Sequence, residues 1–465
     1  MPPNPPPSMS RRRLLLAAAA AGAAPLAACA TRPSDAGWPP IVFVHGNGDT
    51  AALWTTTIWR FESNGWPRER LHAIDLPYPL ARDDDAKAQP GRTSTDEHMA
   101  HLAAEVKKVL AKTGASKVAL VGNSRGGYAI RNFIANGGGA ALVSHAVLGG
   151  VPNHGVYVDT AARQGSEFNG AGPFLTKLNA PQGAQGHEVT AGPRWLTIRS
   201  DNNDKFAQPD GAWIGAKGKP TGVTFEGPAL KGAENLVIAG LDHRESSFSP
   251  KAFAETYRFI AGKAPATLAI VPEAKVVLDG KVSGLGLDNK QGGFATNLPL
   301  VGATVEVYAT NPGTGERLGG PRMRRTIGTD GRWGPFDADG QATYEFVISA
   351  PGYATTHIYR SPFPRSSDVV NLRADRLPDA DRSAAAIVVL TRPRGYFGIP
   401  RDVIVLDGNN PPAGIPSGVA GISTSRLRVS GEASRAVVGE FNGERIVGRA
   451  WPAADNHIVL LELTY

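Results

Sequence analysis

The sequence has almost no cysteine: Cys29 is the only one among its 465 residues. A single thiol can form no disulfide within the chain and no thiolate metal site. Stability therefore has to come from buried apolar cores. With 42% hydrophobic and 20% charged residues the composition is that of a globular protein, and the length predicts two or three structural units.

Charge of one sign is not concentrated anywhere either. The formal net charge is +7, from 49 Lys and Arg against 42 Asp and Glu, but the basic residues are scattered along the chain. Proteins that bind nucleic acids gather such residues in a patch or stripe. The sequence therefore gives no support to a nucleic-acid partner.

The N-terminal stretch predicts an export signal. A Pro-rich leader precedes Ser10-Arg-Arg-Arg-Leu-Leu-Leu and an Ala/Leu run that is too short to span a bilayer comfortably. The paired arginines resemble a twin-arginine signal, and Leu26-Ala-Ala-Cys29 resembles a bacterial lipobox, in which the cysteine is lipidated. The alternative is that Cys29 is an ordinary residue near a signal-peptidase site. We expect a signal peptide over 1–28, a linker over 29–37, and a periplasmic or cell-surface lipoprotein, able to meet a membrane surface through Cys29, or a secreted protein.

Between residues 38 and 262, apolar strand-like runs alternate with helix-like segments, the pattern of a mainly parallel sheet covered on both faces. Apolar residues recur at three- and four-residue spacing over 95–113, which predicts a helix, and a helix over 249–262 should close the domain. The fold class is therefore α/β. The predicted strands are 41–45, 71–75, 117–122, 144–149, 194–199 and 234–239.

One connection breaks this alternation. Residues 153–193 are rich in Gly, Ala, Asn and Pro, and contain the apolar residues Phe168, Phe174 and Leu175. A connection this long is usually functional or disordered. We expect either a lid that gives the active site an apolar wall or a plain surface insertion.

After residue 263 the pattern changes to short runs of Val, Ile, Thr and Tyr between turn signals such as Asp279-Gly280 and Pro351-Gly352, which predicts all-β units. Leu300-Val-Gly-Ala-Thr-Val-Glu-Val-Tyr and Tyr344-Glu-Phe-Val-Ile are similar to stretches of the transthyretin-like sandwiches attached to other secreted proteins. Neither unit contains a nucleophile, a metal cluster or a phosphate loop. We predict a transthyretin-like sandwich over 265–378 and a further β domain over 379–465, with strands at 385–391, 402–406 and 457–464.

The pentapeptide Gly122-Asn-Ser124-Arg-Gly126 lies where a predicted strand meets a helix-like stretch. In such a strand–turn–helix around G-x-S-x-G, the serine hydroxyl is exposed on a sharp turn, and the small residues let strand and helix approach closely. Ser124 is therefore the candidate nucleophile. A second strand runs into the Gly-rich turn His45-Gly-Asn-Gly48, which predicts an oxyanion hole made by the backbone N–H groups of Asn47 and Arg125. For the Arg125 side chain itself, the alternative is a salt bridge on the helix surface, in which case only its backbone serves chemistry.

A serine nucleophile needs a base, and the base needs an orienting carboxylate, in the chain order Ser, acid, His. His243 is the best base, because it follows the last predicted strand directly before the closing helix. His154 and His187, which flank the insertion, are the weaker alternatives.

For the acid, the turn after strand 194–199 offers two residues, Asp201 and Asp204. The carboxylate must reach the far nitrogen of the base, which suits a residue a few positions beyond the strand end, so we favour Asp204 and keep Asp201 as the alternative. Asp242 would point away from the ring of its neighbour, and Asp75 ends an earlier strand, where a structural role fits better.

Taken together, Val42-Phe-Val-His-Gly-Asn-Gly, Val121-Gly-Asn-Ser-Arg-Gly-Gly and Asn235-Leu-Val-Ile-Ala-Gly-Leu-Asp-His resemble the corresponding stretches of small bacterial triacylglycerol lipases, which have the α/β-hydrolase fold. The added β domains resemble a larger archaeal lipase architecture. The resemblance implies a lipase or carboxylesterase with nucleophile Ser124 and base His243, without a metal or organic cofactor. The acid turn is one residue longer than the usual S-x-x-D.

Three functions compete at this level. The leading one is a serine ester hydrolase that cleaves lipophilic acyl esters through an acyl-enzyme intermediate. The second is an aliphatic polyester depolymerase with the same catalytic residues, in which the β units would hold the enzyme on an insoluble surface. The third, from another class, is a surface-binding protein that keeps the hydrolase-like domain only as a scaffold. The β units could also be purely structural.

Overall fold

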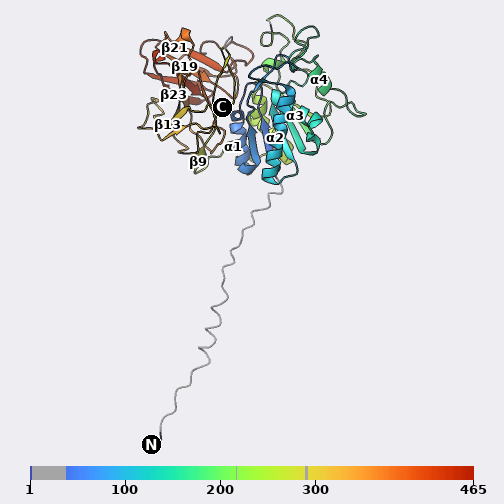
Figure 1. Cartoon of the computed structure of the whole chain (residues 1–465), viewed down its shortest axis with the longest axis horizontal. Helices are drawn as coiled ribbons and strands as arrows, with labels where there is room; N and C mark the ends of the chain where they lie inside the picture. The colour runs from blue at the N-terminus through green and yellow to red at the C-terminus, as the bar shows by residue number, and fades with distance from the viewer. Residues whose placement is uncertain (3–37, 216, 289–291) are drawn as a thin grey trace. The chain divides into compact units, whose positions relative to one another are not determined.

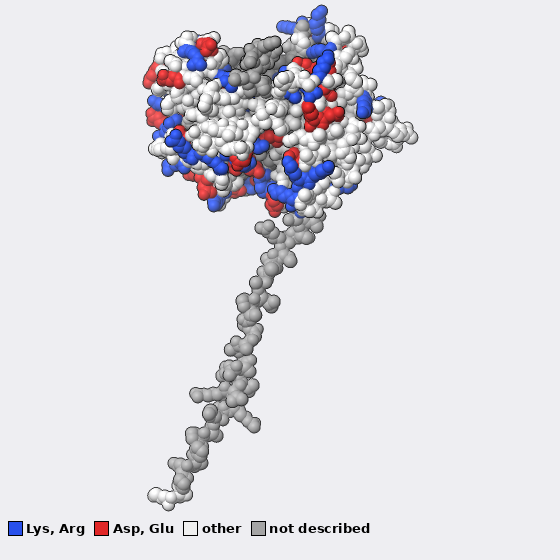
Figure 2. All heavy atoms as spheres, in the orientation of Figure 1, with Lys and Arg blue, Asp and Glu red and all other residues white. Residues whose placement is uncertain are grey.

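The computed structural model describes residues 1–2, 38–215, 217–288 and 292–465, and residues 39–465 of these belong to one compact unit (Figure 1). The predicted signal peptide after residue 2, the linker and Cys29 lie outside the described residues. In the part of the chain that is described, no helix is long and apolar enough to cross a membrane. On the face drawn in Figure 2, basic and acidic side chains are interspersed and form no stripe of one sign.

The first part of this unit, residues 39–262, is the α/β domain. Its six-stranded sheet has the order β2-β1-β5-β6-β7-β8, and all neighbouring strands are parallel, as the sequence predicts. The carboxyl ends of the strands therefore meet at one edge, where the loops gather. The strands are β1 (Ile41–Val44), β2 (Leu71–Ile74), β5 (Val118–Asn123), β6 (Val143–Gly149), β7 (Arg194–Arg199) and β8 (Glu234–Val237), with the short pair β3 (Leu80–Ala81) and β4 (Arg92–Thr93) beside them.

Helices cover both faces of this sheet because its strands are apolar on both sides. Val42 and Val44 of β1 belong to the core under helices α2 and α3, whereas Phe43 between them packs on the other side against Trp54 and Phe61, near α1 and α6. The predicted helix 95–113 is confirmed residue for residue. The helices are α1 (Thr55–Ser63), α2 (Thr95–Thr113), α3 (Arg125–Asn136), α4 (Pro173–Leu178), α5 (Glu245–Phe248) and α6 (Pro250–Ala261), with 3-10 turns at Ala51–Trp54, Arg68–Arg70, Gly139–Ala141 and Lys205–Ala207.

Residues 274–465 form the C-terminal β region, drawn from yellow to red in Figure 1. It contains a seven-stranded sheet of order β14-β13-β16-β17-β24-β19-β21, a three-stranded sheet β20-β22-β23, and short pairs β9-β15, β10-β18 and β11-β12. Its strands are β9 (Val276–Leu278), β10 (Val282–Gly284), β11 (Gly286–Asp288), β12 (Gly292–Phe294), β13 (Thr304–Thr310), β14 (Met323–Thr326), β15 (Phe336–Ala338), β16 (Thr343–Ser349), β17 (Thr355–Arg360), β18 (Leu372–Ala374), β19 (Ala386–Thr391), β20 (Ile404–Leu406), β21 (Thr424–Val429), β22 (Ala436–Phe441), β23 (Glu444–Arg449) and β24 (His457–Glu462), with 3-10 turns at Asp379–Asp381 and Ala453–Asp455.

The seven-stranded sheet runs across the predicted boundary at residue 378. Strands β13 to β17 come from the first predicted β unit, and β19, β21 and β24 come from the second. Strand β24 joins the two groups, because it pairs in parallel with β17 on one side and with β19 on the other. The predicted boundary therefore does not separate two sheets, and the main-chain hydrogen bonds of β24 bind both halves together.

The C-terminal β region is also packed into the α/β domain. Trp59 of α1 is buried in the apolar core of the β region, and its indole N–H donates a 2.8 Å hydrogen bond to the carbonyl oxygen of Ser366. Nearby, Glu62 of the same helix forms an ion pair with Arg365 at 2.9 Å. Helix α1 therefore contributes side chains to the cores of both the α/β domain and the β region, and this shared helix packs the two regions together.

Candidate active site

Ser124 lies at the sharp turn between strand β5 and helix α3. Its backbone has φ 49° and ψ −124°, a conformation that costs energy for a residue with a side chain. Two glycines allow the turn: a Cβ atom on Gly122 would lie 2.6 Å from Cδ1 of Ile130, and one on Gly126 would lie 2.4 Å from the carbonyl oxygen of Val44. The close packing of α3 on β1 and β5 therefore holds the strained serine in place.

The loop after strand β1 borders Ser124. A Cβ atom on Gly46 would lie 3.1 Å from the Cβ atom of Ser124, so the two main chains are in close contact. His45 fixes this loop, because its Nδ1 lies 2.9 Å from the carbonyl oxygen of Gly46 and its Nε2 accepts a 3.1 Å hydrogen bond from the Leu76 amide. Burial lowers the pKa of His45, which keeps the imidazole in the neutral form that these contacts require.

The two amides expected to form an oxyanion hole belong to the residues that directly follow Gly46 and Ser124 in the sequence. Asn47 follows Gly46, and Arg125 is the first residue of α3, where helix N–H groups have no partner within the helix. Among the described residues, neither amide takes part in a hydrogen bond. The Asn47 side chain has a separate task, since its Oδ1 accepts a 2.7 Å bond from the Ala81 amide and ties the loop to β3. Both N–H groups are thus free to donate to a negative oxygen.

His243 and Asp204 meet although they are 39 residues apart in the sequence. The Nδ1 atom of His243 lies 2.9 Å from each carboxylate oxygen of Asp204, and both side chains are buried. The ring of Phe206 packs edge-on against the imidazole at 4.5 Å. The other ring nitrogen, Nε2, is buried and has no hydrogen-bond partner among the described residues. A buried nitrogen without a hydrogen-bond partner costs free energy. Because His243 and Ser124 line the same cavity, a group bound there can supply the partner of Nε2.

The other carboxylates considered from the sequence lie elsewhere. Asp201 accepts bonds from the Asn203 amide at 3.2 Å and the Gly240 amide at 3.1 Å, so it closes its own turn against the neighbouring loop. Asp242 is turned toward Arg392 of the C-terminal β region, with 2.7 Å between Oδ2 and the guanidinium. His154 is paired with a glutamate, Glu188, at 3.2 Å instead of facing the serine. Of all these groups, the structure brings only Asp204 to His243.

A cavity of about 170 Å³ opens at Ser124. Its apolar wall comes from two separate connections: Val156 and Phe168 belong to the insertion 153–193, and Phe206 and Ile214 belong to the connection 200–233 between β7 and β8. The sequence pattern indicates a role beside the active site only for the first connection. The second has few apolar residues and no clear periodicity, so it carries no local signal of its place beside the serine. The cavity is lined by Asn47, Asp49, Asn123, Ser124, Val156, Phe168, Phe206, Ile214, His243, Arg244 and Tyr396.

The insertion 153–193 is anchored to the serine turn through Arg125, whose side chain is fully buried and not on the helix surface. Its guanidinium binds both oxygens of Glu167, at 2.7 and 2.9 Å, and also donates to Thr93 Oγ1 at 2.9 Å and to the Thr93 carbonyl at 2.7 Å. Burial raises the pKa of Glu167, and the charge of Arg125 opposes this. The alternative of a surface ion pair is therefore right about the pairing and wrong about its place, because the insertion folds over this face of α3 and supplies a buried carboxylate.

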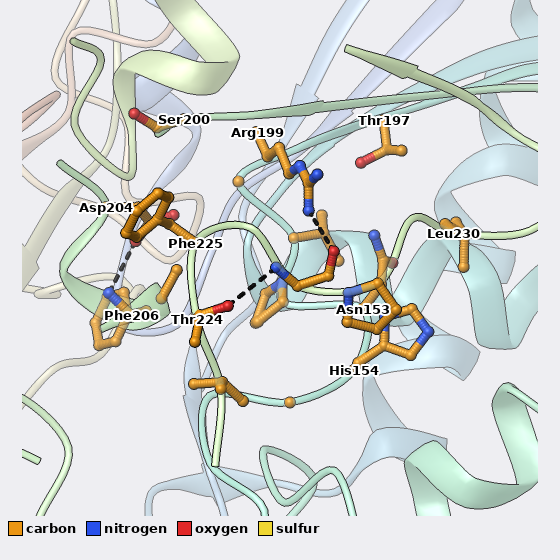
Figure 3. A pocket seen from close by; sticks show the side chains of 18 of the residues that line it. Asn153, His154, Thr197, Arg199, Ser200, Asp204, Phe206, Thr224, Phe225 and Leu230 are labelled. Carbon is orange, nitrogen blue, oxygen red and sulfur yellow. Dashed lines mark hydrogen bonds between the residues drawn. The ribbon is translucent and has the colours of Figure 1, made fainter. Parts of the chain in front are cut away.

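A second cavity of about 330 Å³ lies beside the first, between the start of the insertion and the connection 200–233 (Figure 3). Phe206 lines both cavities, and Asp204 lines the second. In Figure 3 these two residues lie at one side of the second cavity, and His154 and Leu230 at the other. The Phe206 side chain thus stands between the serine cavity and a larger space that Ser124 does not line.

Comparisons with known proteins agree with this fold. Residues 41–280, more than half of the chain, match the alpha/beta hydrolase family, and residues 274–377 match the lipase C-terminal domain. No curated protein matches the chain.

Solved structures with some likeness include Bacillus licheniformis lipase BlEst2. Its propeptide form is 15% identical, over 67% of this chain and 89% of that chain, with a TM-score of 0.36, and its mature form is 21% identical, over 48% and 91%, with a TM-score of 0.34. Bacillus subtilis carboxylesterase CesB is 15% identical over 49% of this chain and 85% of that chain, with a TM-score of 0.27. Likenesses this distant carry no conclusion about the reaction.

Proposed function

The chain belongs to the alpha/beta hydrolase family and its two family matches support an ester hydrolase; we propose that it is a serine hydrolase that cleaves lipophilic acyl esters. In this proposal Ser124 is the nucleophile, His243 the general base, and Asp204 the carboxylate that orients the base. The amides of Asn47 and Arg125 form the oxyanion hole.

One observation carries the proposal: the unpartnered Nε2 of His243 and the strained Ser124 line the same cavity, while Nδ1 of the same ring is held by Asp204 at 2.9 Å. The carboxylate fixes the tautomer in which Nδ1 carries the proton and Nε2 is free to accept one. In the described residues Ser124 and His243 form no hydrogen bond, and such bonds are often completed only when substrate is present.

The reaction then follows in two halves. The Ser124 oxygen attacks the ester carbonyl carbon while Nε2 of His243 takes its proton, and the charge that develops on the carbonyl oxygen is bound by the two amides. Removal of one such donor typically slows a reaction about 10²- to 10³-fold. His243 next gives its proton to the departing alkoxide, the bond between acyl carbon and alcohol oxygen breaks, and the acyl group stays on Ser124. A water molecule, deprotonated by His243, releases it as the acid.

The cavity indicates the kind of acyl group. Val156, Phe168, Phe206 and Ile214 offer only apolar side chains, so the cavity favours an alkyl group over a charged one. A volume of about 170 Å³ is small for a long chain, because typical ligand pockets hold about 300 to 1,000 Å³. We therefore propose a preference for short to medium acyl groups.

The experiment is a series of p-nitrophenyl esters, from acetate to palmitate, hydrolysed by the protein and by its Ser124→Ala variant. We expect turnover that peaks at short to medium chains and is lost in Ser124→Ala, with unchanged thermal unfolding. Turnover that survives in a folded Ser124→Ala variant would refute the proposal. Release of soluble acids from an aliphatic polyester film, absent in the same variant, would instead assign the depolymerase activity.

Export and lipid attachment are part of the proposal, and they rest on the sequence alone. The arginine pair and the lipobox-like Leu26-Ala-Ala-Cys29 support a lipoprotein at a membrane surface. The test is incorporation of labelled palmitate by cells that express the full chain. Incorporation should vanish in Cys29→Ser, and equal labelling of both proteins would exclude attachment at this residue.

A further inference from the structure

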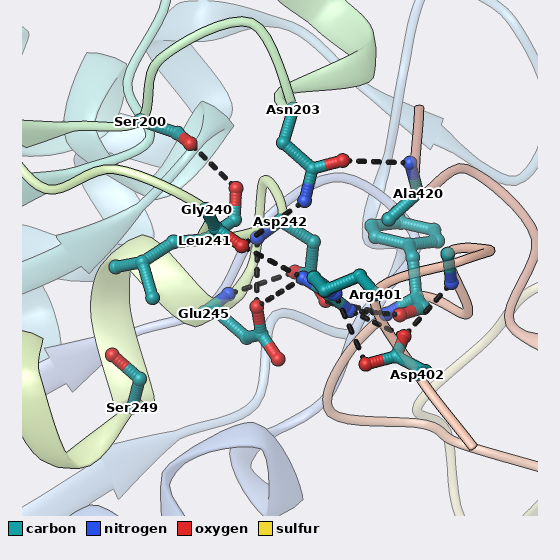
Figure 4. A network of polar contacts seen from close by, with 12 residues as sticks. Ser200, Asn203, Gly240, Leu241, Asp242, Glu245, Ser249, Arg401, Asp402 and Ala420 are labelled. Atoms are coloured by element: carbon teal, nitrogen blue, oxygen red, sulfur yellow. Dashed lines mark hydrogen bonds and ion pairs between the residues drawn. The ribbon is translucent and has the colours of Figure 1, made fainter. Parts of the chain in front are cut away.

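The loop that carries His243 is held by residues that follow it in the sequence by about 150 positions. This histidine loop, residues 238–245, runs from the end of β8 to the first residue of α5. It contacts Arg392 and Tyr396 of the C-terminal β region, and Figure 4 shows Arg401 of the same region beside it. The two segments share a buried network of charged groups, which sequence patterns did not reveal.

Asp242 is at the centre of this network and is completely buried. One carboxylate oxygen accepts bonds from within the loop, from the amides of Arg244 at 2.8 Å and Glu245 at 2.9 Å. The other accepts bonds from the β region, from the Arg392 guanidinium at 2.7 Å and the Tyr396 amide at 2.8 Å. The carboxylate next to the base is therefore satisfied half by its own turn and half by the C-terminal β region.

Glu245 repeats this arrangement at the other end of the loop. Its carboxylate binds Arg392 at 2.6 Å and Arg401 at 2.7 Å, and it also accepts the Asp242 amide at 2.7 Å. Arg401 reaches the Gly240 carbonyl oxygen at 3.1 Å as well. The buried guanidinium of Arg392 thus binds both acidic residues that flank His243, whereas the more exposed Arg401 binds Glu245 at 2.7 Å and lies 3.7 Å from Asp242.

The turn that carries the acid is held in the same way. Asn203 Oδ1 accepts the Ala420 amide at 3.0 Å, and Lys205 Nζ donates to the Gly421 carbonyl oxygen at 3.0 Å. The Lys205 ammonium also lies 4.0 Å from the ring centre of Tyr396, which lines the serine cavity. Asp204 lies between Asn203 and Lys205, so both partners of the His243–Asp204 pair are braced by the C-terminal β region.

We propose that Arg392 is a positioning residue for catalysis: through Asp242 and Glu245 it sets the place of His243, so that the C-terminal β region is needed for turnover itself and not only for contact with lipid surfaces. The inference rests on the proposed function. Buried charges persist where geometry is well satisfied, and removal of one partner leaves the other uncompensated. Without Arg392, the cationic partner left to Asp242 would be the more distant Arg401, at 3.7 Å, and the carboxylate would draw water or rearrange the loop. A displacement of His243 by about 1 Å can cost about 10²-fold in rate.

The experiment compares Arg392→Met with Arg360→Met in the full chain. Arg360 is also buried in the β region and is paired with Glu462 at 2.5 Å, but it contacts neither the histidine loop nor the acid turn, so its variant matches the loss of a buried ion pair. With p-nitrophenyl butyrate, a soluble ester, we expect kcat of Arg392→Met to fall about 10²-fold with KM changed less than about twofold. Arg360→Met should lose thermal stability and keep kcat.

Two more variants keep the test decisive if Arg392→Met does not fold. Arg392→Lys keeps the charge but cannot bind both carboxylates in a fork, so kcat should fall by about tenfold and lie between wild type and Arg392→Met. Arg392→Met combined with Asp242→Asn leaves no unpaired charge at this position, and its kcat should remain low although stability recovers.

The outcomes separate the two proposals. Wild-type protein without Ser124-dependent turnover overturns the proposed function. Active wild type together with folded Arg392 variants of normal kcat overturns the positioning role, and an equal loss of kcat in Arg360→Met does so as well.

Discussion

The serine turn and the histidine loop belong to one candidate site, but they are supported in different ways. Ser124 is held by the close packing of neighbouring glycines and by the ion pair of Arg125 with Glu167, all inside the α/β domain. The histidine loop is held, through Asp242 and Glu245, by Arg392 and Arg401, which belong to another region of the chain. The serine turn is therefore supported within its own domain, whereas the histidine loop also depends on the C-terminal β region.

This difference explains why sequence motifs predict the serine turn but not the residues that support the histidine loop. A motif records the residues that must be close in sequence, such as the two glycines on either side of a serine turn. The supports of the histidine loop are arginines that look like ordinary polar residues of a β unit. A search for catalytic residues by motif alone would treat the C-terminal β region as an attachment, although it contributes Tyr396 to the serine cavity.

The largest effect should come from the acid on the histidine side. In Asp204→Asn the amide cannot hold the imidazole in the productive tautomer, and kcat should fall about 10⁴-fold. The matched control is Asp201→Asn, whose side chain contacts only its own turn and the Gly240 amide. Steady-state kinetics on p-nitrophenyl butyrate checks both. A larger loss in Asp201→Asn would reassign the acid.

The next largest effect is on stability and concerns the buried ion pair of Arg125 with Glu167, beside the serine turn. Arg125→Met leaves Glu167 buried without its partner, and should lower the free energy of unfolding by about 3–5 kcal/mol at neutral pH. Arg258→Met, which breaks a partly exposed ion pair of α6, should cost less than about 1 kcal/mol. Denaturant unfolding measures both. Equal losses would mean that the buried pair adds nothing to the serine turn.

The same variant has a pH dependence of known sign. Burial raises the pKa of Glu167 above its unfolded value, and loss of Arg125 raises it further. Between the unfolded and the folded pKa the native state binds more protons than the unfolded state, so stability falls as pH rises through that range. The penalty of Arg125→Met should therefore be largest at neutral pH and shrink toward pH 4, where Glu167 is protonated. A penalty that grows on acidification contradicts this account.

A smaller effect tests the packing of the serine turn directly. In Gly126→Ala the new methyl group would lie 2.4 Å from the Val44 carbonyl oxygen, so helix α3 must shift, at about 1–3 kcal/mol of stability. The control is Gly320→Ala, where no atom lies within 4 Å of the new group. Thermal unfolding and kcat are the measurements. Kinetics unchanged in Gly126→Ala would show that the strained turn tolerates displacement.

The smallest effect concerns specificity and leaves the ion pairs beside Ser124 and His243 intact. Phe206→Ala removes the side chain between the serine cavity and the larger cavity beside it, so the ratio of kcat/KM for octanoate over acetate esters should rise about tenfold. Phe225→Ala, which lines only the larger cavity, should leave this ratio unchanged in the p-nitrophenyl series. A ratio that rises equally in both variants would show that Phe206 has no special role in selecting the acyl chain length.

Much of the fold was readable from the sequence because it depends on local patterns. The six parallel strands and helix α2 follow from apolar periodicity, and helix α6 begins after Ser249 and ends before Gly262, as its capping residues predict. The bend at Ser124 follows from two glycines. In each case the decisive residues lie within a few positions of one another.

The remainder could not be read because it depends on pairs that are distant in the chain. The residues around Arg125 in the sequence do not indicate its ion pair with Glu167, and those around His243 do not indicate the contact of its loop with Arg392. The connection 200–233 has too few apolar residues to show that Phe206 and Ile214 face a cavity. The boundary placed at residue 378 marks a change of pattern, whereas strand β24 pairs across it.

The central place of β24 has a consequence in time. It lies between β17 and β19, yet a ribosome makes it after every other strand of that sheet. At about 5–20 residues per second, roughly 10 to 40 seconds pass between the synthesis of His243 and that of Glu462. During this interval the seven-stranded sheet, whose strand β19 directly precedes Arg392, lacks β24 and is incomplete. If Arg392 positions the base, each new molecule is inactive as an esterase until β24 docks.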